Sequence, residues 1–469
     1  MANDTKKAKA GLGGKLKNAA AKSGGFVLPH VPRVGLDLMV KQLRKKMVKH
    51  FDKNPEGLNE RELRWKKSFT LKMLDVYLDI SKDMSPNVRY SMVNNLANNA
   101  ILKGRVGRDD FEEKEGFRPP SLGVMSPTMR CNLTCTGCYA FEYNKTKTGD
   151  LSYETMDRVC KELKSFGAYF VVITGGEPWI RKQDLLKLFK EHNDMYFITY
   201  TNGTLIDEAT AKEIEKLGNV TPCISVEGYE KDTDMRRGEG VAGRSYRAMK
   251  YLKDNGVPFA ISVTMTSNNA ELVTSQEFYD FYIDKGCAFA WYFQYMPMGK
   301  KPDVDLMVTP AQRTMARRRA IEQRESDMPF LVADFWNDGV LTDGCIAAGR
   351  GYFHISGSGA IEPCVFAQFH VDNINDTTIR EALKSEFFQT YRKAAEDVDD
   401  KFRPCGVIDH PENLRKAVKA GRDAGECVKH SCGEGGEALI REDGIAPQLN
   451  KLAEDRAQTI GKEWKNGEM

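Results

Sequence analysis

The segment GVMSPTMRCNLTCTGCYA (residues 123–140) places three cysteines, Cys131, Cys135 and Cys138, directly after a short apolar run that predicts a β-strand. Three thiolates complete neither a tetrahedral zinc site nor an even set of disulfides. Thiolates are also the usual ligands of iron-sulfur clusters, and three of them leave one iron of a 4Fe-4S cluster without a protein ligand. The cysteine string alone fits either part of a zinc site or an open cluster site.

Five further short runs of β-branched or aromatic residues follow the first strand. They are residues 169–174, 196–201, 222–228, 259–265 and 289–294, and amphipathic segments of ten to fourteen residues lie between them. This alternation predicts an α/β fold, a partial (β/α)6 TIM-like barrel with a helical N-terminal region and a small α+β cluster-binding C-terminal domain. Chemistry in such barrels gathers at the C-terminal ends of the strands. The three cysteines follow such a strand end.

Length and composition favour a large globular protein of a reducing compartment. The chain has 469 residues, of which 41% are hydrophobic, and its formal net charge is +3. No run of eighteen apolar residues occurs, and the N-terminus lacks a hydrophobic signal core. Eleven cysteines, several of them clustered, fit metal ligation better than a secreted disulfide framework. We therefore expect a cytoplasmic protein.

The N-terminal region is basic. Residues 1–53 hold thirteen Lys or Arg against three Asp, and residues 1–34 are expected to form a disordered basic arm. A helix should follow, because Leu36, Val40, Leu43, Met47 and Phe51 recur at spacings of three or four. Such a basic amphipathic helix either packs on the rest of the protein or lies on an anionic membrane surface. Further helices are expected up to residue 118.

Four motifs mark the ends of the next strands in chain order. They are TGGEP (174–178), TNG (201–203), ISVEG (224–228) and SVTMTSNN (262–269), with DMRRG (234–238) between the last two. Together with the spacing C-x3-C-x2-C, these motifs resemble the radical S-adenosylmethionine (SAM) superfamily. The resemblance covers residues 120 to about 295 and implies a radical SAM core over residues 119–305.

The resemblance implies the ligands of that core. Cys131, Cys135 and Cys138 would bind a catalytic 4Fe-4S cluster whose fourth partner is SAM itself. The residues expected to contact SAM are Tyr139, Gly175, Gly176, Glu177, Pro178, Thr201, Asn202, Ser225 and Arg237. Arg237 would pair with the SAM carboxylate. Two positions depart from the family pattern: Gly137 stands where an aromatic residue is usual, and Glu227 where Asp is more usual.

The resemblance also implies the reaction. A reduced cluster would cleave SAM to methionine and a 5′-deoxyadenosyl radical, which abstracts hydrogen from an unactivated carbon of the substrate. An electron donor such as flavodoxin or ferredoxin is expected. Relatives modify peptides, proteins, lipids or isoprenoids, and the sequence leaves a peptide or a lipid substrate open.

A second cysteine set lies in residues 306–438. Cys345 and Cys364 bracket Gly359 in the pattern C-x13-G-x4-C, which resembles the start of a SPASM or twitch extension. Cys405 and either Cys427 or Cys432 could complete four ligands of one auxiliary 4Fe-4S cluster, or of a structural zinc site. The full cysteine run of a SPASM domain, C-x2-C-x5-C-x3-C, is absent. Residues 439–469 are expected to form a helical tail.

Several groups receive no functional assignment. Cys160, Cys223 and Cys287 are expected to be buried and chemically quiet, and His354 and His410 to be structural. The alternative to an enzyme is a non-catalytic iron-sulfur or zinc-binding adaptor for electron transfer, whose basic arm binds nucleic acid. Aromatic residues are sparse in that arm, so no specific nucleic acid partner is expected.

Overall fold

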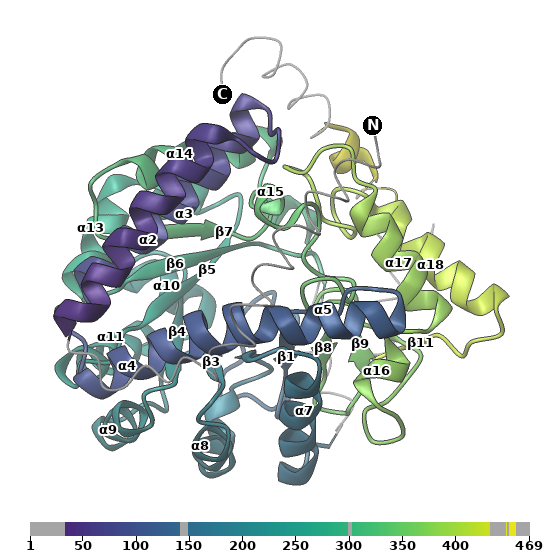
Figure 1. The fold of residues 1–469 in the computed structure, drawn as a ribbon, viewed down its shortest axis with the longest axis horizontal. Coiled ribbons are helices and arrows are strands. Elements are labelled where there is room, and N and C mark those ends of the chain that lie inside the picture. Colours follow the sequence, from purple (N-terminus) through teal and green to yellow (C-terminus); the bar gives the residue numbers. More distant parts are fainter. Residues whose placement is uncertain (1–32, 141–148, 299–302, 432–446, 448–449, 456–469) are drawn as a thin grey trace.

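The computed structural model describes residues 33–140, 149–298, 303–431, 447 and 450–455 (Figure 1). The predicted basic arm lies almost wholly outside these residues. Cys432 and most of the predicted helical tail also lie outside them.

Helices fill the chain from residue 33 to residue 115. They are α2 (Arg33–Lys53), α3 (Glu60–Ile80), α4 (Pro86–Val93), the π-helix η1 (Asn94–Lys103) and α5 (Gly104–Glu115). Asn59 caps α3 with a reciprocal capping box to Glu62, and left-handed Gly116 ends α5. Helix α2 packs on α3 through the buried Leu36 and Phe51. Leu43 was expected on that apolar stripe, but its side chain is 45% exposed.

Seven parallel strands form the core of the molecule. They are β1 (Leu122–Met125), β2 (Phe170–Ile173), β3 (Tyr196–Thr201), β4 (Val220–Val226), β5 (Ala260–Met265), β6 (Phe289–Gln294) and β7 (Leu331–Asp334). Two short strands, β8 (His354–Ile355) and β9 (Ile361–Glu362), extend this sheet. The sheet order is β7-β6-β5-β4-β3-β2-β1-β8-β9, and no pairing between the edge strands β7 and β9 is found in the described residues. The barrel is therefore partial, which confirms the predicted fold class.

Helices connect these strands and cover the outer face of the sheet, as Figure 1 shows. They are α7 (Tyr153–Ser165), the 3₁₀ helix η2 (Pro178–Arg181), α8 (Lys182–Glu191), α9 (Glu208–Leu217), α10 (Glu230–Arg237), α11 (Val241–Asp254), α12 (Ala270–Val273), α13 (Gln276–Asp284), the 3₁₀ helix η3 (Val304–Leu306) and α14 (Pro310–Glu325). Helices α7, α8 and α9 are amphipathic, and each buries its apolar face against the strands.

Strand register aligns side chains in rows on the inner face of the barrel. Ser225 of β4 pairs with Ser262 of β5, and Ser262 pairs with Trp291 of β6. Because side chains alternate along a strand, the residues next to them, such as Val226 and Val263, point to the outer helices and are fully buried. The inner rows are therefore free to line a chamber.

The sheet continues beyond residue 305, where the sequence predicts the start of the cluster domain. Helix α14 and strand β7 add a seventh parallel unit, and β8 (His354–Ile355) pairs in parallel with β1. Strand β9 (Ile361–Glu362) closes a hairpin with β8 around Gly359. The extension is thus joined to the core by main-chain hydrogen bonds.

The remaining elements of the extension are short. They are α15 (Gly339–Thr342), β10 (Phe369–His370), α16 (Ile379–Ala382), α17 (Glu386–Glu396), α18 (Pro411–Asp423) and β11 (Lys429–His430). Helices α17 and α18 pack on each other, and β10 pairs with β11. Within the part of the chain that the structure describes, no helix is both long and apolar enough to cross a membrane.

Candidate functional site

The open end of the barrel holds a cavity of about 250 Å³. Its lining brings together residues from six strand ends and from the cysteine loop. Of the residues predicted to form the site, it includes Cys131, Cys135, Cys138, Tyr139, Gly175, Gly176, Thr201, Asn202, Ser225 and Arg237. Glu177 and Pro178, which were also predicted to contact the cofactor, do not line the cavity.

The glycine turn after β2 lies against the backbone of the cysteine loop. Gly176 N–H donates to Thr128 O at 3.0 Å, and Glu177 N–H donates to Arg130 O at 2.8 Å. A Cβ atom on Gly176 would overlap the Arg130 carbonyl group, and one on Gly175, whose φ is +123°, would overlap the Thr128 oxygen. Only glycine allows this approach, so the turn fixes where the cysteine loop begins.

Glu177 points away from the cavity and ties the glycine turn to the end of β3. Its carboxylate accepts hydrogen bonds from Trp179 N–H at 3.1 Å, Thr201 Oγ1 at 2.7 Å and Asn202 N–H at 2.8 Å. Burial raises its pKa from 4.5 to about 7, against the opposing effect of these donors. Glu177 therefore positions Thr201 and Asn202, and the sequence could not show which way its side chain turns.

The charged groups that line the cavity are two arginines, and both contact one carboxylate that does not line it. Arg236 Nη1 and Arg237 Nη2 donate to the same oxygen, Glu227 Oε1, at 2.6 and 2.5 Å. Glu227 Oε2 is buried and has no hydrogen-bond partner among the described residues. Two cations on one carboxylate leave a net positive charge beside the cysteine loop. Arg236 was not predicted as a site residue, although it adjoins Arg237.

Tyr295 explains why Gly137 stands where an aromatic residue is usual. Gly137 has a left-handed φ of +66°, and a Cβ atom there would lie 2.8 Å from Cε2 of the Tyr295 ring. The ring follows β6 and lines the cavity beside the cysteines. A residue more than 150 positions away thus fills the space that a side chain at position 137 would need. Nothing local in the sequence indicates it.

The inner part of the cavity is apolar and aromatic. Phe170, Val172, Tyr200, Trp291 and Phe293 lie on its walls. Arg236 and Arg237 are the only Lys, Arg, Asp or Glu among its lining residues within the described chain. Such a chamber suits an uncharged group better than a charged one, because a charge buried there would find no partner.

A second cavity of about 30 Å³ lies in the C-terminal extension and is lined by Cys345, Cys364 and Cys405. Cys427, a predicted ligand, is exposed and does not line it. Three side chains, Phe335, Ile346 and Phe366, line both cavities, so the two sites share one wall. The sequence did not predict a role for these three wall residues.

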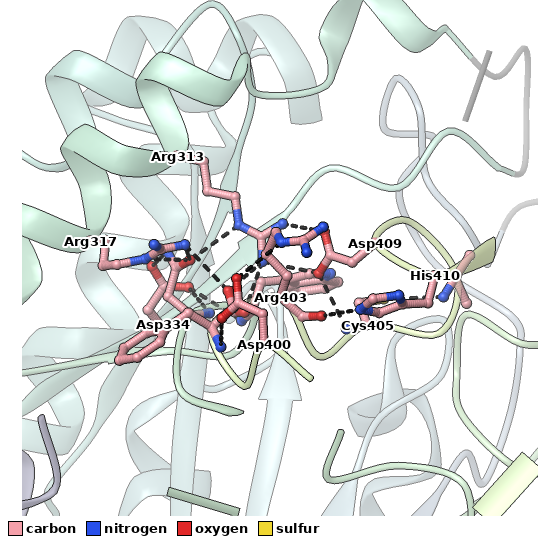
Figure 2. Close-up of polar contacts among 12 residues, drawn as sticks. Arg313, Arg317, Asp334, Asp400, Arg403, Cys405, Asp409 and His410 are labelled. Carbon is pink, nitrogen blue, oxygen red and sulfur yellow. Dashed lines mark hydrogen bonds and ion pairs between the residues drawn. The ribbon is translucent and has the colours of Figure 1, made fainter. Parts of the chain in front are cut away.

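A buried ion pair holds the loop that carries Cys405, as Figure 2 shows. Arg313 of α14 makes a two-pronged contact with Asp409, and both side chains are at most 1% exposed. Asp409 in turn accepts a hydrogen bond from Cys405 N–H at 3.2 Å. Arg313 also donates to the carbonyl oxygens of Trp336 and Phe402 at 3.0 and 3.1 Å. Arg313 of α14 thus holds Cys405 in position through Asp409.

Both cysteine sets carry hydrogen bonds that suit thiolate sulfur. The amide two residues further along donates to Cys131, Cys364 and Cys405 at 3.4 Å each, from Leu133, Phe366 and Val407. Burial raises the pKa of these three thiols to about 12, and the amide donors oppose that rise. In the described residues no three His, Cys, Asp or Glu side chains converge on a point fit for one metal ion. The sulfur ligands available at both sites fit a group that binds thiolates.

The cysteines and histidines without an assigned role lie elsewhere. Cys160, Cys223 and Cys287 are buried and line neither of these two cavities. His354 is fully buried between Ser126 Oγ at 2.7 Å and Glu362 Oε2 at 2.6 Å, where it links β1 to the β8–β9 hairpin. His410 contacts the Arg403 carbonyl group at 2.9 Å.

Comparison with known proteins places both regions in families. A sequence model of the radical SAM superfamily matches residues 125–278, and one of the SPASM iron-sulfur cluster-binding domain matches residues 345–406. The AdoMet-dependent heme synthase of Oleidesulfovibrio alaskensis is 28% identical over 59% of this chain and 78% of its own length. The PqqA peptide cyclase of Bradyrhizobium diazoefficiens is 26% identical over 54% of this chain and 69% of its own length.

Solved structures give weaker likenesses. SuiB of Streptococcus suis, bound to its precursor peptide SuiA, aligns with a TM-score of 0.49 at 21% identity over 60% of this chain and 68% of that one. The two family matches cover the core and the extension, and those domains bind a 4Fe-4S cluster with S-adenosylmethionine and auxiliary iron-sulfur clusters. The chain therefore carries a radical SAM region over residues 125–278 and, after it, a SPASM region over residues 345–406.

Proposed function

We propose that the protein is an enzyme that abstracts hydrogen from an unactivated carbon in the apolar chamber of the barrel. The observation that carries this proposal is the convergence of Cys131, Cys135 and Cys138 with the glycine turn and Arg237 on one cavity. When bound there, the reduced cluster supplies the electron that cleaves S-adenosylmethionine and generates the 5′-deoxyadenosyl radical. The family of the chain and its relatives among enzymes support the assignment.

The residues of this chain would hold and shield the reactants. Three thiolates would leave one iron open, and Arg237 would supply positive charge for the carboxylate of S-adenosylmethionine. The backbone of Gly175 and Gly176 would approach its amino group, and Asn202 and Ser225 line the same cavity. The aromatic walls would keep water away from the reacting atoms.

The test is product formation by anaerobically reconstituted protein with dithionite and S-adenosylmethionine. We expect 5′-deoxyadenosine from the wild type and from Cys160→Ala, a variant in a buried cysteine outside both cavities. Cys135→Ala should give none. Equal yields from Cys135→Ala and Cys160→Ala would contradict the proposal, and no product from any of them would favour a non-catalytic iron-sulfur or zinc-binding adaptor.

We also propose that Cys345, Cys364 and Cys405 hold one auxiliary 4Fe-4S cluster. They line a common cavity within the region that matches a cluster-binding domain. The exposure of Cys427 weighs against it as the fourth ligand, and Cys432 is the other candidate. A flavodoxin or ferredoxin remains the proposed electron donor, and the cytoplasm the proposed compartment.

The substrate of the reaction is proposed to carry an uncharged, apolar reacting group. A lipid is favoured by one surface: α2 exposes Leu38, Met39 and Leu43 by 44 to 53%, among Lys41, Lys45, Lys46 and Lys49. Exposed apolar side chains among lysines suit an anionic membrane surface. A peptide is the second candidate, because relatives include a peptide cyclase and a sporulation killing factor maturation protein.

Liposome co-sedimentation tests whether the protein binds a membrane surface, which would favour a lipid over a peptide as substrate. We expect the wild type to sediment with vesicles that contain anionic lipid, and the variant Leu38→Gln/Met39→Gln/Leu43→Gln to remain in solution. Ile101 and Leu102 of η1 are at least as exposed, at 61% and 53%, so Ile101→Gln/Leu102→Gln is a matched control that should still sediment. Equal sedimentation of both variants and the wild type would count against the α2 surface.

A further inference from the structure

Trp336 lines the cavity of the auxiliary cysteines, and its indole N–H has no hydrogen-bond partner among the described residues. Its side chain is 1% exposed and lines the same small cavity as Cys345, Cys364 and Cys405. Its indole Nε1 is buried and has no hydrogen-bond partner among the described residues. An indole N–H buried without an acceptor destabilises the folded state, so such groups are usually paired.

The ring of Trp336 cannot easily turn to find another acceptor. Its centroid lies 5.1 Å from Phe335 and 5.5 Å from Phe366, and both neighbours belong to the wall between the two cavities. The backbone is held as well, because Trp336 N–H donates to Asp334 Oδ1 at 3.3 Å and its carbonyl accepts from Arg313 at 3.0 Å. The indole is therefore fixed at the cavity with its donor free.

Sulfur is the acceptor that this cavity offers. The Tyr352 hydroxyl lies 3.0 Å from Cys364 Sγ, and the amides of Phe366 and Val407 donate to Cys364 and Cys405. The sulfurs of Cys364 and Cys405 thus have hydrogen-bond contacts with nearby donors. Hydrogen bonds to the sulfurs of an iron-sulfur cluster stabilise its more negative, reduced state and raise its reduction potential.

We propose that the Trp336 indole N–H donates a hydrogen bond to a sulfur of the auxiliary cluster, either a bridging sulfide or a cysteine thiolate. Trp336 is then a positioning and tuning residue: it ligates no iron but makes the auxiliary cluster easier to reduce. The inference rests on the assignment of that cluster to Cys345, Cys364 and Cys405.

The test is a dithionite titration of anaerobic protein followed by EPR of the auxiliary cluster. In Trp336→Phe the ratio of reduced to oxidised auxiliary cluster at a fixed potential should fall about tenfold, a negative shift of about 59 mV for one electron. Trp291→Phe is the matched control, because Trp291 Nε1 is also buried and unpaired but lines the other cavity. Trp291→Phe should leave the reduction potential of the auxiliary cluster unchanged.

An unchanged auxiliary potential in Trp336→Phe would overturn the proposal. If that variant does not fold, pulsed EPR of wild-type protein labelled with ¹⁵N at the tryptophan indoles decides instead. We expect a ¹⁵N coupling to the reduced auxiliary cluster, and its absence would overturn the inference. Iron analysis separates this outcome from failure of the cluster assignment: wild-type protein with about four rather than about eight irons would refute the auxiliary cluster itself.

Discussion

At the scale of single residues, Glu177 makes the stability of the fold depend on pH. Burial raises the pKa of its carboxyl group to about 7, so between pH 4.5 and 7 the native state keeps a proton that the unfolded chain has released. Stability from this group is therefore highest below pH 4.5 and falls as the pH rises to 7, by on the order of 3 kcal/mol. Urea unfolding from pH 4.5 to 8 measures this slope.

Glu177→Gln should remove that pH-dependent loss, because the amide does not titrate. Gln offers only one acceptor oxygen to the three donors, so the variant should be less stable at pH 5 than the wild type. Glu239→Gln, at an exposed position, is the matched control and should keep the wild-type slope. An unchanged slope in Glu177→Gln would show that another group titrates.

Gly176 should tolerate no side chain. In Gly176→Ala the added methyl group would meet the Arg130 carbonyl group, which leads into the cysteine loop. We expect a loss of about 3 kcal/mol in the free energy of unfolding and a loss of iron from the core cluster. Gly149→Ala is the control, since nothing lies within 4 Å of its added Cβ atom. Full iron content in Gly176→Ala would contradict the role given to the turn.

The sequence predicts residue types at the site better than side-chain directions. The cysteine loop, the glycine turn, Asn202, Ser225 and Arg237 do converge on one cavity. The direction of Glu177 depends on the amides at the end of β3, which are distant in sequence, and could not be predicted. Tyr295 meets Gly137 only through the fold.

At the scale of elements, α14 holds the Cys405 loop through the Arg313–Asp409 ion pair. Removing one partner of a buried pair costs about 3–5 kcal/mol. We therefore expect Arg313→Met to lower the melting temperature and to release the auxiliary iron while the core cluster remains. Calorimetry and iron analysis on the same samples measure both effects.

Arg324→Met is the matched control for that experiment. Arg324 also lies on α14, has a fully buried side chain and pairs with Asp338 at 2.8 Å. Within the described residues, its hydrogen bonds go to Val332 and Asp338 and not to the Cys405 loop. It should lose stability and keep the auxiliary iron. If both variants lost the same iron, the effect would be general instability rather than loss of the loop's support.

Elements with a strong local pattern were predictable, and those defined by distant pairing were not. The first six strands and the intervening helices follow from alternating apolar runs. Strand β8 has only two residues, which pair with β1 more than 220 positions earlier. Such a short run carries no usable period, so the continuation of the sheet through β8 could only be seen in the fold.

At the scale of the whole molecule, one sheet joins the two cysteine sites. Strands β8 and β9 extend the sheet beside β1, and Phe335, Ile346 and Phe366 separate the two cavities. This arrangement places the auxiliary cysteines next to the chamber in which the substrate is proposed to react. The two cavities are thus lined in common by three side chains.

The most direct test of the central claim is EPR of the reduced core cluster before and after addition of S-adenosylmethionine. If three thiolates leave one iron open, binding at that iron should change the g values of the wild type, and Cys135→Ala should lack the signal. A spectrum that S-adenosylmethionine leaves unchanged, or purified protein that holds zinc and no iron, would contradict the account.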